Sequence, residues 1–147
     1  MRSTRRLLLA ASAALLLLTG CGSAPATPSA KAKTYTVTSH QASVGGHTET
    51  VLTTSKGFTL YYLTTDTSTT STCTASACTS IWPPLVLTGT PTLAPGLSGT
   101  IGVIKDANGS QVVYNGHPLY TYSGDSAPGQ ANGEGLLGTW FVVTPGL

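Results

Sequence analysis

The sequence predicts an all-β fold: a single domain of two duplicated antiparallel β-units, related by a pseudo-twofold axis and joined to long polar loops. Three observations predict it. After its first twenty residues the chain is rich in Thr, Gly, Ser and Pro and poor in charge, and Thr favours strands while Gly and Pro mark turns. An internal repeat runs through this part. No segment of it has the periodicity of an amphipathic helix, apart from one short helical turn expected near residues 78–82.

The N-terminal segment has the order of a secretory signal peptide. Three basic residues, Arg2, Arg5 and Arg6, precede an apolar run from Leu7 to Leu18. This run is shorter than the roughly 20 residues that a membrane-spanning helix needs. We therefore assign residues 1–20 to a cleaved signal peptide.

The segment Leu18-Thr19-Gly20-Cys21 resembles the bacterial lipobox. That resemblance implies acylation of Cys21, for example with palmitate, and anchoring of the chain to the extracytoplasmic face of the cell membrane. Two acyl chains anchor firmly because each buried methylene contributes about 0.8 kcal/mol. Residues 21–34 then form a flexible, polar linker, and the folded domain spans residues 35–147.

Removal of the signal peptide changes the charge of the chain. All three arginines are lost, and four lysines face five acidic residues, which gives a formal charge of −1. No basic patch for nucleic acid is left. The partners we expect are the membrane, through the lipid on Cys21, and a cell-wall component or envelope protein.

Two cysteines stay in the folded part once Cys21 carries the anchor. Cys73 and Cys78 are separated by four residues, and an oxidising compartment allows them to pair. Zinc sites need further ligands and redox motifs usually have two intervening residues. We expect a structural disulfide, with a metal site and a redox pair as the alternatives.

The internal repeat aligns residues 57–66 with residues 116–125. Gly, Leu, Tyr and Asp coincide at a constant offset of 59, and Trp82 aligns with Trp140 at an offset of 58. The two units cover about residues 45–88 and 100–145. Because stacking arrays usually need three or more copies, two copies favour a closed pseudo-symmetric domain.

The strands are expected where apolar and polar residues alternate between turn residues. Two hairpins are predicted, one with its turn at residues 54–57 and a second, clearer one at residues 106–109. Polar loops are expected at residues 64–80 and 123–138. The expected strands are Tyr35–Thr38, Val51–Thr53, Phe58–Leu63, Ile101–Ile104, Gln111–Tyr114, Leu119–Tyr122 and Trp140–Val143.

At the repeat the chain resembles a bacterial lipoprotein family, a secreted repeat of unknown function known by a Tyr-x-aromatic-x-x-Asp motif. Residues 120–125 fit this motif fully, whereas residues 61–66 have Leu63 in place of the aromatic residue. The stretch from Cys73 and Cys78 to Trp82-Pro83-Pro84-Leu85 is also similar to the family pattern. The resemblance implies an extracytoplasmic lipoprotein and brings no established activity with it.

Asp66 and Asp125 are the candidate catalytic residues. A pseudo-twofold axis could bring the two carboxyl groups together, where they would share a proton or act as acid and base. In the alternative, which we favour, each Asp ends a strand and accepts hydrogen bonds from the amides of the following loop.

Tyr61, Tyr120 and Tyr122 are the candidate binding residues, because aromatic rings stack on ligands and carry a polar hydroxyl. In the alternative they pack in the core with hydrogen-bonded hydroxyls. The three histidines have no ligand spacing, so we expect no metal and no cofactor.

The leading hypothesis is a membrane-anchored, extracytoplasmic lipoprotein whose domain is a non-enzymatic binding or structural part of the cell envelope. It follows from the lipobox, the linker and the lack of a Gly-x-Ser-x-Gly elbow or phosphate loop. The alternatives are a hydrolase that uses Asp66 and Asp125, or an accessory factor in envelope electron transfer or metal handling.

Overall fold

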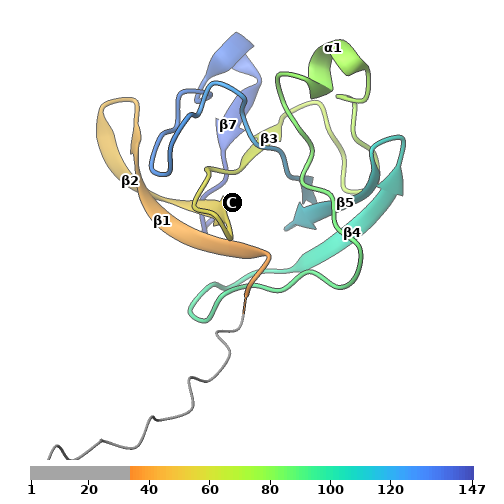
Figure 1. The fold of residues 1–147 in the computed structure, drawn as a ribbon, viewed down its shortest axis with the longest axis horizontal. Helices are drawn as coiled ribbons and strands as arrows, with labels where there is room; N and C mark the ends of the chain where they lie inside the picture. The colour runs from red at the N-terminus through yellow and green to blue at the C-terminus, as the bar shows by residue number, and fades with distance from the viewer. Residues whose placement is uncertain (1–33) are drawn as a thin grey trace, which may run out of the picture. The chain divides into compact units, whose positions relative to one another are not determined.

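The computed structural model describes residues 34–147, and Figure 1 shows their arrangement. The predicted signal peptide, Cys21 and nearly all of the predicted linker lie outside the described residues. Small antiparallel sheets dominate, with one short helix and one 3₁₀ turn. Within residues 34–147 no helix is long and apolar enough to cross a membrane. The all-β prediction is therefore confirmed.

The longest strands form a hairpin that the sequence analysis missed. β1 (Val37–Val44) pairs with β2 (His47–Thr54) over their whole length, and the chain turns at Gly45 and Gly46, both with positive φ. Such a two-residue turn is favourable in a hairpin because glycine adopts positive φ without steric cost. The prediction of a strand over only 35–38 was wrong, since β1 is too polar for a clear alternation to extend beyond Thr38.

The predicted turn at residues 54–57 is present, but it closes a single bridge instead of a full hairpin. Thr53 pairs with Thr59, and the amide of Phe58 donates to the side chain of Thr54. The chain then leads directly into β3 (Tyr61–Leu63), which pairs with β7 (Trp140–Val142). The expected strand at residues 119–122 makes only isolated bridges through Tyr120.

The second predicted hairpin is confirmed. β4 (Ile101–Asp106) pairs with β5 (Gly109–Tyr114), and β6 (His117–Pro118) adds to β5. The side chain of Asp106 accepts the amide of Asn108 inside the turn. The predicted polar loops contain the two short helical elements, α1 (Ser76–Thr79) and η1 (Leu136–Gly138).

The two repeats make the same backbone hydrogen bonds. In the first repeat Leu60 donates to Leu52, Leu52 donates to Val143, and Val143 donates to Leu60. The three bonds close a cycle whose N···O distances lie between 2.7 and 2.9 Å. In the second repeat an equivalent cycle joins Leu119, Val112 and Leu85, again in the same direction of donation.

Each cycle takes its third member from the other repeat. Val143 follows Trp140 in the second unit and completes the first cycle, while Leu85 follows Trp82 in the first unit and completes the second. Five of the six residues are buried, and Leu85 is half-buried in the same apolar cluster. The two duplicated units are thus confirmed and interlocked, so neither can bury its apolar side chains without the other.

Candidate functional site

The pseudo-twofold axis passes between Tyr61 and Tyr120. Each of these residues donates its amide to the carbonyl of the other, with N···O distances of 2.9 and 3.0 Å. Beside them Trp82 stacks on Trp140, with ring centroids 3.9 Å apart and an interplanar angle of 3°. Each tyrosine ring meets the tryptophan of its own repeat edge-on, at 5.4 and 5.1 Å. Four aromatic residues therefore form the centre of the domain.

The tyrosine hydroxyls connect the repeats a second time. The hydroxyl of Tyr61 donates to Asp125 at 2.7 Å, and the hydroxyl of Tyr120 donates to Asp66 at 2.6 Å. The Tyr and Asp of the shared motif are thus partners, but each Tyr bonds the Asp of the other copy. The Tyr and the Asp that are identical in the two repeats therefore take part in the same reciprocal contact.

The second oxygen of each carboxylate binds the loop that follows it. Asp66 accepts the amide and the hydroxyl of Thr72, and Asp125 accepts the amide of Asn132. No hydrogen bond among residues 34–147 joins the two carboxyl groups. Asp66 and Asp125 therefore lie in two separate, equivalent hydrogen-bond networks. In each network the carboxylate accepts an amide of the following loop, as in the alternative in which each Asp ends a strand.

Burial changes the acidity of this network. Desolvation raises the pKa of Tyr61 and of Tyr120, and the hydrogen bond to an Asp carboxylate raises it further. Both hydroxyls therefore stay protonated and act as donors. Desolvation also raises the pKa of Asp125, which is 6% exposed, against the lowering effect of the bonds from Tyr61 and Asn132.

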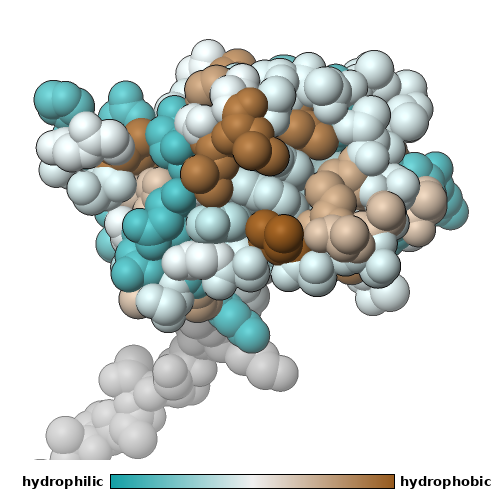
Figure 2. Space-filling model, turned by 90° about the horizontal axis from the view of Figure 1, so that it is seen from above, coloured by the Kyte–Doolittle hydropathy of each residue, from teal (hydrophilic) through white to brown (hydrophobic). Residues whose placement is uncertain are grey.

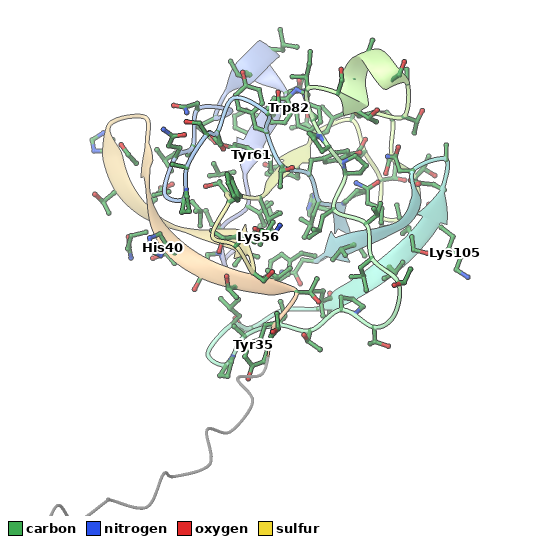
Figure 3. All side chains as sticks on the ribbon, viewed as in Figure 1. Tyr35, His40, Lys56, Tyr61, Trp82 and Lys105 are labelled. Carbon is green, nitrogen blue, oxygen red and sulfur yellow. A yellow bond between two sulfur atoms is a disulfide. The ribbon has the colours of Figure 1, made fainter. Side chains whose placement is uncertain are left out.

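The three candidate binding tyrosines differ in exposure. Tyr61 and Tyr120 are fully buried, so their rings offer no face to a ligand. Figure 3 shows Tyr61 near Trp82 inside the domain. Tyr122 is half-buried: its ring packs on Trp82 with centroids 4.5 Å apart, and it also lines a surface pocket. Of the three, only Tyr122 reaches a place where a ligand could bind.

The pocket has a volume of about 450 Å³, within the usual size range of small-molecule sites. It mixes aromatic, hydroxyl and charged side chains, and its walls come from both repeats. Of its residues, only Tyr122 and Asp125 were predicted as site residues from the sequence. The lining residues are Thr54, Ser55, Lys56, Phe58, Leu85, Thr121, Tyr122 and Asp125.

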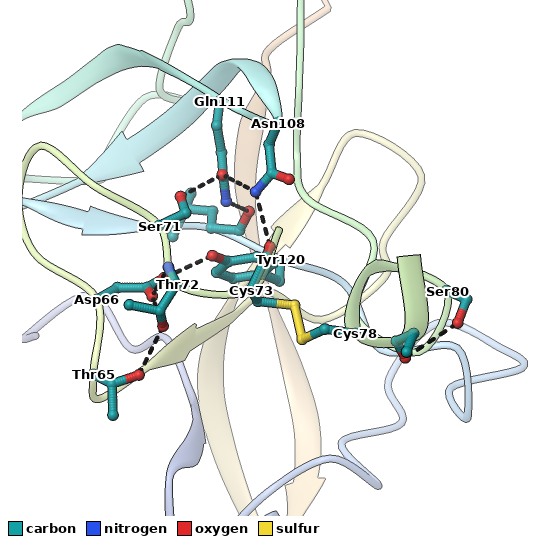
Figure 4. Close-up of a disulfide and its surroundings, with 12 residues drawn as sticks. Thr65, Asp66, Ser71, Thr72, Cys73, Cys78, Ser80, Asn108, Gln111 and Tyr120 are labelled. Atoms are coloured by element: carbon teal, nitrogen blue, oxygen red, sulfur yellow. Dashed lines mark hydrogen bonds between the residues drawn. A yellow bond between two sulfur atoms is a disulfide. The ribbon is translucent and has the colours of Figure 1, made fainter. Parts of the chain in front are cut away.

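The predicted disulfide between Cys73 and Cys78 is present, with Cα atoms 5.6 Å apart (Figure 4). It closes the tip of the 64–80 loop. The carbonyl of Cys73 accepts the side-chain amide of Asn108, and the buried Gln111 accepts the hydroxyl of Ser71. The disulfide thus sits in a loop that is tied both to Asp66, through Thr72, and to the second hairpin.

Exposed apolar residues lie near the two short helical elements. Leu137 in η1 is 87% exposed and Ile81, just after α1, is 48% exposed. Figure 2 looks onto the end of the domain where α1 and η1 lie in Figure 1, and hydrophobic atoms gather on that face. In the described part of the chain, His, Cys, Asp and Glu form no group of three that could hold a metal ion.

A family model described as a secreted repeat of unknown function matches the chain twice, over residues 46–86 and 102–144. These matches correspond to the two repeats inferred from the sequence and to the two interlocked units of the structure. A secreted repeat fits an extracytoplasmic protein. Searches of curated proteins and of solved structures gave no match.

Proposed function

Because the chain belongs to the family of the secreted repeat of unknown function, we propose that it is a membrane-anchored, non-enzymatic binding domain of the cell envelope. One observation carries this proposal. The two acids of the repeated motif are engaged with buried tyrosines and loop amides, so they hold the repeats together. The pocket lies where the two repeats differ in sequence, and it remains as the surface at which a ligand could bind.

Anchoring through Cys21 is the first part of the proposal. The lipobox resemblance supports it, because two acyl chains on Cys21 would anchor the chain firmly. The full chain, expressed in a bacterium that processes lipoproteins, should take up radiolabelled palmitate and fractionate with membranes. Cys21→Ser should abolish both, and unchanged labelling or fractionation would contradict the anchor.

Binding of an envelope component is the second part. The full chain, reconstituted in lipid nanodiscs, should retain material from cell-wall or envelope fractions that empty nanodiscs do not. The test variant is Phe58→Ala, which alters the pocket, leaves the Tyr–Asp network in place and should retain less of this material than wild type. Equal retention by wild type, variant and empty nanodiscs would contradict a binding role for the pocket.

One observation favours the second candidate function, a hydrolase. Asp125 lines the pocket, and burial raises its pKa, as in carboxylic acids that act as proton donors. In this reading Asp125 acts without Asp66. Glycosidase and peptidase assays with wild type and Asp125→Asn decide the matter: turnover lost in the variant supports the hydrolase, whereas ligand binding without turnover supports the binding domain.

A further inference from the structure

The pocket has a filled counterpart on the other side of the pseudo-twofold axis. There the ring of Tyr62 lies against His117, with centroids 4.9 Å apart, and near Phe141, at 6.1 Å. In the alignment of the repeats Tyr62 corresponds to Thr121, and His117 corresponds to Phe58. The chain thus fills one of two equivalent places with its own aromatic ring.

Thr121 leaves the other place open. Its side chain is much smaller than that of Tyr62, and its hydroxyl reaches only to the carbonyl of Pro83, at 3.4 Å. Phe58, unlike His117, has no aromatic contact among residues 34–147, although it is half-buried. Thr121 and Phe58 both line the pocket. The pocket therefore has the size and the aromatic wall suited to one ring that the chain does not supply.

The polar groups that line the pocket indicate which kind of ring could bind there. Three hydroxyl groups line the pocket, from Thr54, Ser55 and Thr121. Asp125 adds a buried carboxylate whose oxygens each already accept one hydrogen bond and can accept a second. These groups match a ring with several hydroxyls, and the ring of Phe58, with Tyr122 beside it in the pocket wall, matches the apolar C–H face of a sugar.

Lys56 adds a positive charge to the wall. It is exposed, and within the described residues its ammonium group makes no ion pair with any acid. Residues 35–147 carry two lysines and five acidic residues, a formal charge of −3, and in this setting an unpaired lysine beside a ring-sized pocket is suited to an acidic substituent. A carboxylate on the ligand would pair with Lys56 while the ring lies against Phe58.

We infer that the pocket between the residue 54–58 turn and Thr121 binds a sugar ring that carries a carboxylate, in the place that the Tyr62 ring occupies on the other side. The inference rests on the proposed binding function and names its ligand class. The sugar ring packs against Phe58 and Tyr122, its hydroxyls donate to Asp125, and its carboxylate faces Lys56.

The test is calorimetric titration of the full chain in nanodiscs with N-acetylmuramic acid, which has a carboxylate, and with N-acetylglucosamine, which lacks it. The first sugar should bind, and the second should bind up to about fivefold more weakly, because an exposed ion pair contributes little. Lys56→Gln should remove this difference between the two sugars. Failure of both sugars to bind, or tighter binding of the sugar without a carboxylate, would overturn the inference.

Thr121→Tyr is the decisive variant because it copies the filled side. The new ring should occupy the pocket and abolish sugar binding, while near-ultraviolet circular dichroism shows an intact tryptophan stack. The matched control, Tyr62→Thr, alters the opposite side and should leave binding at the pocket unchanged. Wild-type affinity in a folded Thr121→Tyr chain would disprove the location.

A second variant keeps the location testable if Thr121→Tyr does not fold. Phe58→Ala removes one stacking face and should weaken sugar binding about tenfold; unchanged affinity would overturn the inference. The two proposals also fail separately. Retention of envelope material by wild type and by Thr121→Tyr alike would leave the binding function standing and end the assignment to this pocket.

Discussion

Trp82 lies flat on Trp140, and the two residues occupy equivalent positions in the two repeats. The stack is therefore a contact of the duplicated chain with itself across its axis. Both rings are nearly fully buried, and each also meets the tyrosine of its own repeat. Loss of either ring should disturb both halves of the domain.

Replacement of one tryptophan measures this dependence. Trp82→Ala and Trp140→Ala should each lower the free energy of unfolding by about 3–5 kcal/mol, because a buried indole is removed and a cavity is left. The double variant should lose less than the sum, by about 0.5–1.5 kcal/mol, since the stack is already broken by one change. Urea unfolding of the four chains gives these values. Strict additivity would show that the rings do not stabilise each other.

The reciprocal hydrogen bonds give a second prediction, which compares Tyr61→Phe with Tyr120→Phe. Tyr61→Phe leaves the buried carboxylate of Asp125 without its hydroxyl donor and should cost about 1–3 kcal/mol of unfolding free energy. Tyr120→Phe should cost less, because Asp66 is more exposed and water can replace the donor. Denaturant titration checks the order. A larger cost for Tyr120→Phe would contradict the burial argument.

Local signals predicted much of the fold. The turn at Asn108-Gly109 and the alternation around it are contained in a short stretch, so the hairpin of β4 and β5 could be found from the sequence. The β7 strand was found in the same way. The hairpin of β1 and β2 was missed although Gly45-Gly46 is also a turn signal, because its strands carry too many exposed polar residues.

Long-range contacts could not be found from local patterns. The repeat alignment indicated that equivalent residues lie near an axis, but it did not say which ones meet. Leu85 and Val143 each complete the hydrogen-bond cycle of the opposite unit, and each Tyr bonds the Asp of the opposite repeat. Both arrangements depend on how the two units pack together, which no local pattern contains. The pocket was missed for another reason. It arises from a difference between the repeats, Thr121 in one and Tyr62 in the other, whereas the repeat alignment rests on the residues that are identical.

The acidity of Asp125 leads to a third prediction, on pH. Burial raises the pKa of Asp125 in the folded chain above its ordinary value of 3.8, so the folded state binds the proton more tightly than the unfolded state. Its contribution to stability is therefore full below pH 3.8 and is lost as pH rises through the raised pKa. Thermal unfolding should show that the stability of wild type minus that of Asp125→Asn falls with rising pH over this window. A difference that rises with pH would contradict the sign.

The disulfide gives a fourth prediction. Because Cys73 and Cys78 close a loop of only a few residues, the cross-link should contribute about 2 kcal/mol, near the lower end for disulfides. The double variant Cys73→Ser, Cys78→Ser should lose this amount in urea unfolding and keep its fold, since the loop stays tied through Thr72 and Asn108. A chain that no longer unfolds cooperatively would show that the disulfide holds more than its loop.

The fifth prediction concerns Leu137, which has a left-handed backbone, φ 56° and ψ 12°, and a side chain that is 87% exposed. A residue with a Cβ atom loses about 1–2 kcal/mol in this conformation, and asparagine tolerates it better. Leu137→Asn should therefore raise the free energy of unfolding by up to about 1 kcal/mol. The control is Val86→Asn, at another exposed apolar position that has no positive φ, which should change stability little. A loss of stability in Leu137→Asn would mean that the leucine side chain makes contacts worth more than the strain of its backbone.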